Sequence, residues 1–324
     1  MIQQLQEQAL AAWDKIHPDN VKPAALDYLI QSRDYIIIFW FDRAGKSKKP
    51  VLISKIPRSA IFNRYAERSV NLVEQLIADL RPPIRNTLPT RVLAGQVNGL
   101  IHIVMGIMPG EPIIIPPDNY LGRRAANRHL SAFLDWLVEF QAQATLNKRV
   151  YAWEDFLQSY QEEPGLDFLR SDPYQGISQE LIHRLPVTEI PLTWGYGDAH
   201  HSNILLERSR VSGVIDWIGV KEETWFYTDW YYFLFFYALE FYKKNARVDR
   251  DAQRRLAIST TMGAGDHWLA KLFQNKTQQY LEHYSFDPQF SREFTLTFLY
   301  DLHWPQGKGQ LLKEAYSIYG QFPK

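Results

Sequence analysis

The sequence predicts an α+β fold with two lobes, a small β-rich amino-terminal lobe and a larger, mainly helical carboxy-terminal lobe. The chain has 324 residues, of which 46% are hydrophobic, and at roughly 150 residues per domain this length favours two domains. Short apolar, β-branched runs dominate from residue 25 to about 100, whereas helical periodicity dominates after the turn at Pro109. We therefore place the lobes at residues 1–108 and 109–324.

Charge and composition exclude several classes of protein. The 36 basic and 36 acidic residues cancel, so we expect no nucleic-acid partner, and the absence of cysteine excludes thiolate chemistry and favours a reducing, cytoplasmic location. The most apolar segment, 225–242, is shorter than the roughly 20 residues of a spanning helix and contains Asp229 and Glu240, so it predicts a buried core helix. We expect no membrane partner, and the oligomeric state stays open.

The amino-terminal lobe combines helical and strand patterns. Leu5, Ala9, Trp13 and Ile16 recur at helical spacing. The remaining pattern predicts a hairpin over 34–42 and 51–56, a helix over 60–80 that stops before two prolines, and an apolar strand over 99–108.

In the carboxy-terminal lobe, residues 119–146 predict a long amphipathic helix, and most of the following chain is also helical. The exception is "SNILLERSRVSGVIDW", residues 202–217, where two β-branched runs flank a polar turn and predict a hairpin.

This hairpin brings polar side chains together. With 207–210 as the turn, Asn203 is expected opposite Val214, two residues from Asp216 and roughly 7 Å from it at the backbone. A carboxylate and an amide oxygen suit magnesium. Asp198 lies five residues before Asn203, on the loop that enters the hairpin, where it is a candidate base beside the metal.

The adjacent histidines of this loop offer an alternative, a zinc site. His200 and His201 would point to opposite faces of a strand or about 100° apart on a helix, so they do not readily bind one ion. Structural hydrogen bonding is the favoured interpretation of both.

"GYGDAHHSNILLERSRVSGVIDW" resembles the catalytic segment of the aminoglycoside phosphotransferase and choline kinase superfamily, which reads H-G-D-x-H-x-x-N-x-L before a strand that ends in I-D-W or I-D-F. The matching residues are Gly197, Asp198, His200, Asn203, Asp216 and Trp217. Tyr196 stands where the family usually has a histidine that braces the loop. The resemblance implies a bilobal protein-kinase-like fold, with Asp198 as catalytic base and Asn203 and Asp216 as metal ligands.

The resemblance extends into the amino-terminal lobe. It implies that Lys55 binds the nucleotide phosphates, that Glu67 pairs with this lysine, and that Met105 and Ile107 belong to the hinge that holds adenine. Glu74 lies two helical turns from Glu67 and is a rival partner. Each residue alone has a purely structural explanation, but their order before the catalytic segment favours the functional one.

Two further features belong to the same comparison. Residues 30–36, "IQSRDYI", occupy the place of the family's glycine-containing phosphate loop without a glycine, and Asp229 matches an aspartate that braces the catalytic loop from within the helical lobe. An unpaired carboxylate among so many aromatic residues would be costly to bury, so we expect hydrogen bonds to Asp229.

The resemblance implies a kinase that uses ATP and Mg²⁺ to transfer the γ-phosphate to the hydroxyl of a small molecule. An aminoglycoside or amino sugar is the preferred acceptor, and choline or another amino alcohol is the alternative. Acidic pairs that could recognise a cationic acceptor are Glu154-Asp155, Glu162-Glu163 and Glu222-Glu223. A nucleotide-binding pseudokinase without transfer activity and a metal-dependent hydrolase are the rival functions.

Overall fold

The computed structural model describes the chain except for residues 1, 18–21, 24, 33–34, 45–48, 90–92, 152–165, 186–187, 303–307 and 322–324. The chain folds into two compact units, which are described separately below. The first unit comprises Met1–Pro112, Tyr196–Asp198 and Asn203–Glu222, and the second comprises the rest. The segment around the expected catalytic hairpin therefore groups with the amino-terminal part of the chain.

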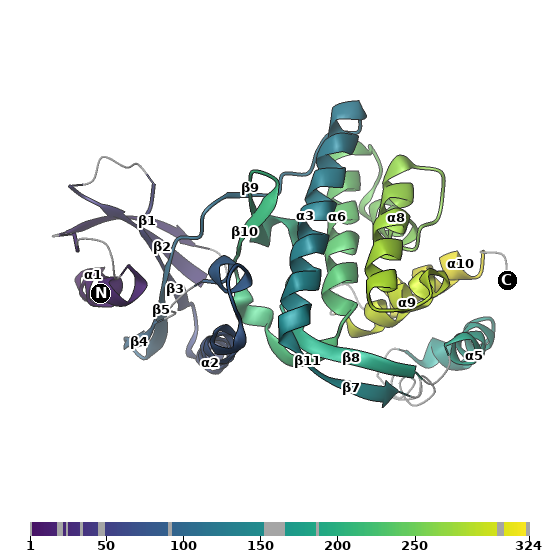
Figure 1. Ribbon diagram of the computed structural model, residues 1–324, viewed down its shortest axis with the longest axis horizontal. Coiled ribbons are helices and arrows are strands. Elements are labelled where there is room, and N and C mark those ends of the chain that lie inside the picture. The colour runs from purple at the N-terminus through teal and green to yellow at the C-terminus, as the bar shows by residue number, and fades with distance from the viewer. Residues whose placement is uncertain are drawn as a thin grey trace. The chain divides into compact units, whose positions relative to one another are not determined.

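An antiparallel five-stranded sheet forms the centre of the first unit, with strand order β1-β2-β3-β5-β4 (Figure 1). Its strands are β1 (Leu26–Ser32), β2 (Tyr35–Asp42), β3 (Leu52–Pro57), β4 (Leu93–Val97) and β5 (Leu100–Gly106). The β2–β3 pairing confirms the predicted hairpin, with Ile37 opposite Lys55. In β3, buried and half-buried residues alternate, as expected for a strand whose two faces have different neighbours.

Helix α1 (Ile2–Ile16) covers one face of this sheet and confirms the predicted amino-terminal helix. Its apolar residues Leu5, Ala9, Trp13 and Ile16 pack in one buried cluster with sheet residues such as Trp40. The apolar stripe of the helix thus matches its periodicity.

A buried polar chain fastens α1 to the sheet. The Trp40 indole donates to Ser54 Oγ at 2.8 Å, and Ser54 Oγ lies 2.7 Å from His102 Nε2. His102 Nδ1 lies 2.7 Å from Gln8 Oε1, while the Gln8 amide donates to the Gln96 carbonyl. Because Gln8 Oε1 can only accept, His102 carries its proton on Nδ1 and accepts from Ser54 at Nε2. Burial lowers the pKa of His102 to about 4, so its neutral form is favoured.

Helix α2 (Asn63–Asp79) confirms the helix predicted over 60–80, and short 3₁₀ turns precede and follow it (Ala60–Phe62 and Ile84–Thr87). Its buried side chains include Ala66, Val70 and Val73, which recur at helical spacing. A second, three-stranded sheet of the first unit has the order β10-β9-β6 and consists of β6 (Glu111–Pro112), β9 (Ile204–Glu207) and β10 (Arg210–Val214).

The second unit is mainly helical. Its helices are α3 (Tyr120–Ala144), α5 (Tyr174–Arg184), α6 (Thr228–Asn245), α7 (Arg250–Thr261), α8 (Trp268–His283), α9 (Ser291–Asp301) and α10 (Lys308–Tyr319). The 3₁₀ turns Asp167–Arg170 and Pro288–Phe290 precede α5 and α9. A small sheet of order β11-β8-β7 is built from β7 (Thr145–Tyr151), β8 (Thr188–Gly195) and β11 (Lys221–Trp225). Helix α3 confirms the predicted long helix.

Helix α6 lies in the core, as the apolar segment 225–242 predicted. Figure 1 shows α6 alongside α3, and the Phe133 ring stacks on Phe233 at 4.1 Å between centroids. Trp230, also from α6, is fully buried and donates to Thr277 Oγ1 of α8. Among the helices of the described ranges, none has the length and apolarity that crossing a membrane requires.

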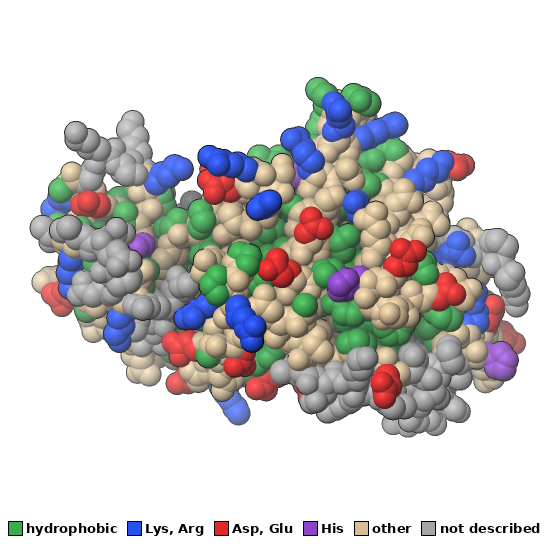
Figure 2. All heavy atoms as spheres, in the orientation of Figure 1, with side chains coloured by type: hydrophobic (Ala, Val, Ile, Leu, Met, Phe, Trp, Pro, Cys, Tyr) green, Lys and Arg blue, Asp and Glu red, His purple; other side chains and the backbone are tan. Residues whose placement is uncertain are grey.

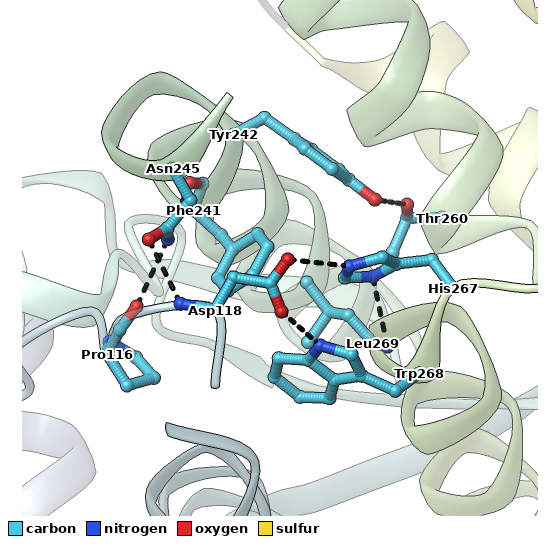
Figure 3. A network of polar contacts seen from close by, with 9 residues as sticks. All are labelled: Pro116, Asp118, Phe241, Tyr242, Asn245, Thr260, His267, Trp268 and Leu269. Atoms are coloured by element: carbon cyan, nitrogen blue, oxygen red, sulfur yellow. Dashed lines mark hydrogen bonds and ion pairs between the residues drawn. The ribbon is translucent and has the colours of Figure 1, made fainter. Parts of the chain in front are cut away.

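A polar network fixes the segment that precedes α3 (Figure 3). The Asp118 carboxylate accepts from Trp268 Nε1 at 2.5 Å and from His267 Nε2 at 3.3 Å. The Asn245 side chain donates to the Pro116 carbonyl and accepts from the Asp118 backbone amide. The start of α3 is therefore tied to the end of α6 and the beginning of α8.

Candidate active site

The ammonium of Lys55 lies next to the carboxylate of Asp216 in the first unit. Nζ is 2.8 Å from Oδ1, although the two residues are 161 positions apart in sequence. The Lys55 side chain is largely buried and that of Asp216 is partly exposed. Asp216 directly precedes the 3₁₀ turn Trp217–Gly219 and has a left-handed backbone (φ 67°, ψ 55°), a rare conformation for a residue other than glycine.

Asp198 and Asn203 are also in contact. The Asn203 amide nitrogen donates to Asp198 Oδ2 at 2.9 Å and to the Asp198 carbonyl at 3.2 Å. This bond orients both side chains, because the amide nitrogen faces the carboxylate and the amide oxygen is left on the other side. Asp198, Asn203, Asp216 and Lys55 all belong to the first unit.

The hairpin that links these residues has a different register from the predicted one. Val214 pairs with Ile204, not with Asn203, and a register shift lies between Val211 and Gly213. The reason is a bulge at Ser212, whose hydroxyl donates to the Pro109 and Leu205 carbonyls.

In the observed register, Asn203 and Asp216 are closer along the paired strands than in the predicted one. The Ile215 amide donates to the Asn203 carbonyl at 2.9 Å, so Asn203 is paired one residue before Asp216. The expected turn at 207–210 is present, with positive φ at Arg208 and Ser209.

Tyr196 braces this arrangement. Its side chain is fully buried, its hydroxyl donates to the Ile215 carbonyl, and its ring packs on Trp217 at 4.7 Å between centroids. The tyrosine thus ties the entrance of the Asp198 loop to the residue before Asp216. The sequence shows that a tyrosine replaces the family's histidine, but it does not show the hydrogen bond that the tyrosine forms. The position of a tyrosine near the end of a β-strand was the one signal for this bond.

Gly197 is constrained both by its backbone conformation and by a close neighbour. Its φ is +80°, and a Cβ at this position would lie 2.1 Å from the Gly219 carbonyl oxygen. Only glycine satisfies both the backbone conformation and the close approach. The Gly-Asp pair of the sequence motif is therefore explained by packing against the turn that follows Asp216.

The helix glutamates are not brought to Lys55. Glu67 and Glu74 are both exposed on α2, and in the part of the chain that the structure describes neither forms an ion pair with Lys55. The α2 residues that approach the lysine are Ser69, Val70 and Val73, which line a small cavity of about 40 Å³ together with Lys55, Pro89, Ile103, Met105, Asp216 and Trp217. Most of these side chains are apolar, so the cavity places an apolar surface beside the Lys55 side chain.

The expected hinge residues occupy the end of β5. Met105 lines the cavity behind Lys55, whereas Ile107 lies just past the strand and is 37% exposed. Lys55 is paired with Ile103 across β3 and β5, so Met105 lies on the same face of the sheet two residues further along. Residues 33 and 34 of the segment expected to replace the phosphate loop lie outside the described residues.

The two loop histidines belong to the second unit and have structural surroundings. His200 Nδ1 lies 2.8 Å from Ser202 Oγ, and its ring packs on Phe236. His201 is buried, and its pKa is lowered to about 3, first by burial and then by His200, Lys243 and His129. Across the described ranges, no three His, Cys, Asp or Glu side chains are grouped as a metal site would require.

The remaining expected residues are placed as follows. Asp229 is 1% exposed in the first turn of α6, which confirms its burial. Glu222 and Glu223 are exposed on β11, and the pairs Glu154-Asp155 and Glu162-Glu163 lie outside the described residues.

The chemistry of the donor set fits magnesium. Asn203 directs its amide nitrogen to Asp198, which leaves its oxygen for another partner, and Asp216 supplies a carboxylate. Hard divalent cations prefer such oxygen ligands and retain positions for phosphate oxygens and water. The residues present could therefore hold Mg²⁺ without any nitrogen or sulfur ligand.

Comparison with known proteins identifies the family. The model of the phosphotransferase enzyme family matches residues 50–256. The chain belongs to this family. The match includes Lys55 and the whole segment from Tyr196 to Asp216, and family membership makes the chain a small-molecule phosphotransferase that acts on a hydroxyl group. No curated protein matches the chain.

Solved structures are similar at low sequence identity. Macrolide 2'-phosphotransferase MphH from Brachybacterium faecium is 11% identical over 98% of this chain and 99% of that chain, with a TM-score of 0.51. Amicoumacin kinase hAmiN is 13% identical over 99% and 96%, with a TM-score of 0.41, and a type I macrolide 2'-phosphotransferase is 17% identical over 98% and 95%, with a TM-score of 0.45. The likeness to MphH confirms the predicted α+β, protein-kinase-like fold.

Proposed function

We propose that this family member is a kinase that uses ATP and Mg²⁺ to phosphorylate a hydroxyl group of a small molecule. One observation carries the proposal: within one compact unit Lys55 pairs with Asp216, Asn203 pairs with Asp198, and the Ile215 amide bonds to the Asn203 carbonyl beside Asp216. A cation for phosphates, two oxygen ligands and a carboxylate base are the parts that phosphoryl transfer requires.

Asp198 would act as the base and would position the acceptor hydroxyl. Its Oδ2 accepts from Asn203, which would hold the carboxylate in position to accept the proton of the acceptor hydroxyl. Holding that hydroxyl in line with the transferred phosphate contributes more than proton removal, because phosphoryl transfer depends mainly on alignment and charge neutralisation.

Lys55 and the ligand pair manage the charge of the phosphates. Lys55 would donate to phosphate oxygens from its position in β3. Asn203 and Asp216 would hold Mg²⁺, which would neutralise phosphate charge when bound. Adenine would lie against Met105 and Ile107 at the end of β5. Glu67 stays our proposed partner for Lys55 in a nucleotide-bound state, with Glu74 as the alternative.

We assign nucleotide binding to residues 1–108 and catalysis with acceptor binding to 109–324. The preferred acceptor is an aminoglycoside or amino sugar, and the exposed Glu222 and Glu223 support a cationic molecule. Choline or another amino alcohol is the alternative. A pseudokinase is disfavoured because Lys55, Asp198 and both oxygen ligands are retained. We propose a cytoplasmic location, since the chain lacks cysteine.

Thermal unfolding with ATP alone, Mg²⁺ alone and both together tests this function before any acceptor is known. A ligand at 100 times its dissociation constant adds about 2.7 kcal/mol of stability. We expect a large rise in melting temperature only with both ligands, and we expect Lys55→Met to remove it. Lys15→Met, which changes an exposed lysine of α1, is the matched control.

No shift with millimolar ATP and Mg²⁺ would refute nucleotide binding. A shift without phosphate transfer to any hydroxyl acceptor in a panel of aminoglycosides, amino sugars, choline and amino alcohols would favour the pseudokinase.

A further inference from the structure

A cavity of about 710 Å³ lies in the second unit among α5, the start of α9 and α10. It has no residue in common with the proposed active site, and neither α3 nor α6 lines it. Figure 1 shows α5, α9 and α10 gathered at one end of the helical unit, and Figure 2 shows arginine or lysine side chains on the surface near that end. The volume is in the range of small-molecule sites, which span about 300–1,000 Å³.

Buried hydrogen bonds hold the aromatic walls of this cavity in place. The hydroxyl of Tyr316 lies 2.9 Å from Ser178 Oγ and also bonds with Tyr300, and the Tyr174 ring packs edge-on against Tyr316. The Tyr319 hydroxyl donates to a buried carboxylate, Glu293, at 2.8 Å. Tyr316 is fully buried and Tyr319 is 5% exposed, so these two tyrosines support the wall from behind, and the half-buried Tyr174 ring is the aromatic surface that lines the cavity.

Two arginines supply positive charge at the same cavity. Arg184, at the end of α5, and Arg292, at the start of α9, both line it. Arg184 Nε lies 3.3 Å from Glu293 Oε1, and the Glu293 carboxylate is fully buried. Within the described ranges the two terminal nitrogens of Arg184 bond to no side chain or carbonyl. Because Glu293 contacts Arg184 through Nε, the two terminal nitrogens of the Arg184 guanidinium group can bind a second oxyanion.

The two guanidinium groups are close enough to repel each other. The pKa of Arg292 is lowered, first by burial; Glu293 opposes this shift, and Arg184 adds to it by a smaller amount than Glu293 opposes it. Both arginines also line a second cavity of about 260 Å³, so each of them borders two cavities.

We propose that this cavity binds a small organic oxyanion, a phosphate monoester or carboxylate that carries a ring. The charged group lies between Arg184 and Arg292, and the ring lies against the Tyr174 ring. Two carboxylates also line the cavity, the half-buried Glu180 of α5 and the exposed Asp172, which precedes that helix. These carboxylates select against a second negative charge on the far side of the ligand. The inference does not depend on the proposed kinase function.

Calorimetric titration of the full chain with phenyl phosphate, inorganic phosphate and phenol tests the proposal. We expect saturable binding of phenyl phosphate, weaker binding of inorganic phosphate and none of phenol. Arg292→Gln should weaken phenyl phosphate about tenfold or more, the usual effect of losing a charge-assisted hydrogen bond. This variant leaves the Arg184–Glu293 pair intact, so the fold should persist.

Two control variants assign the binding to this cavity. Arg250→Gln removes an exposed arginine at the start of α7 and should leave the affinity unchanged. Lys55→Met should also leave it unchanged, because the phosphate site of the proposed kinase is elsewhere. Loss of binding in Lys55→Met, an unaltered affinity in Arg292→Gln, absence of saturable binding, or equal affinity for inorganic phosphate would each overturn the proposal.

Discussion

Replacing Tyr196 by phenylalanine isolates the bond that ties the Asp198 loop to the strand before Asp216. The change removes one hydroxyl from a fully buried ring and leaves the Ile215 carbonyl without that donor. A buried acceptor that loses its partner costs about 1–3 kcal/mol. The ring contact with Trp217 should survive, because the volume hardly changes.

The functional consequence should exceed the loss of stability. Ile215 directly precedes Asp216 and pairs with Asn203, so a looser Ile215 would displace both proposed magnesium ligands. Residues that orient metal ligands typically contribute about tenfold to a hundredfold to metal affinity. We therefore expect the magnesium-dependent affinity for ATP to fall about tenfold in Tyr196→Phe.

The assay combines urea unfolding with calorimetric titration of ATP in the presence of Mg²⁺. Tyr231→Phe is the matched control, since this fully buried tyrosine of α6 donates to the Ser291 carbonyl at 3.0 Å in the other unit. The control should lose similar stability and retain nucleotide affinity. If Tyr196→Phe and Tyr231→Phe behave alike in both measurements, the Tyr196 bond is structural and the bracing argument is wrong.

Three other predictions concern single residues of the first unit. Asp198→Asn should keep the fold and ATP binding and lower the turnover number about 10² to 10⁴-fold, as for loss of a general base, and steady-state kinetics checks this. Protonation of His102 should make the protein about 2 kcal/mol less stable at pH 5.0 than at pH 7.5. The pKa of His102 is near 6.5 in the unfolded chain and about 4 in the folded one, so stability is lost as the pH falls. Urea unfolding of the wild type and of His102→Gln at both pH values measures this difference. Gly197→Ala should destabilise more than Gly99→Ala, because both have positive φ but only the first places a Cβ against the Gly219 carbonyl; thermal unfolding compares them.

Local patterns predicted several helices and the β2–β3 hairpin because the causes of these elements are local, whereas the sheet of β7, β8 and β11 was not predicted, since 202–217 was the one expected exception in a helical lobe. The spacing of Leu5, Ala9, Trp13 and Ile16 predicted α1, and all four are buried against the sheet. The sequence could not show which surface they cover, because Trp40 and its neighbours reach the helix only after the strands pair.

The hairpin shows where alternation fails. The predicted register counted back from the turn without interruption, whereas Ser212 forms a bulge by bonding to Pro109, a residue 103 positions away. No pattern within 202–217 contains that information. The order of Asp198, Asn203 and Asp216 survived the error because a bulge shifts the pairing by one residue and leaves the strand ends together.

The resemblance to a family singled out Lys55, which spacing alone did not, and Lys55 lies beside Asp216. The resemblance was least informative for α2. Helical periodicity already placed Ala66, Val70 and Val73 inward, and Glu67 and Glu74 flank that stripe rather than lie in it. A glutamate at the edge of the buried face can reach Lys55 only if the helix rotates or the lysine side chain moves.

The ion pair of Lys55 with Asp216 constrains how the proposed substrates would bind. Lys55 has one ammonium group, and at 2.8 Å from Asp216 its charge is already matched by a carboxylate. ATP alone would have to draw the lysine away and leave Asp216 facing phosphates of the same sign, which is unfavourable. With Mg²⁺ present, Asp216 gains another cationic partner, and Lys55 is released to the phosphates without leaving that carboxylate uncompensated. The same pair that holds the site together without ligands therefore favours joint binding over binding of either ligand alone, which is why the combined thermal shift should exceed the sum of the separate ones.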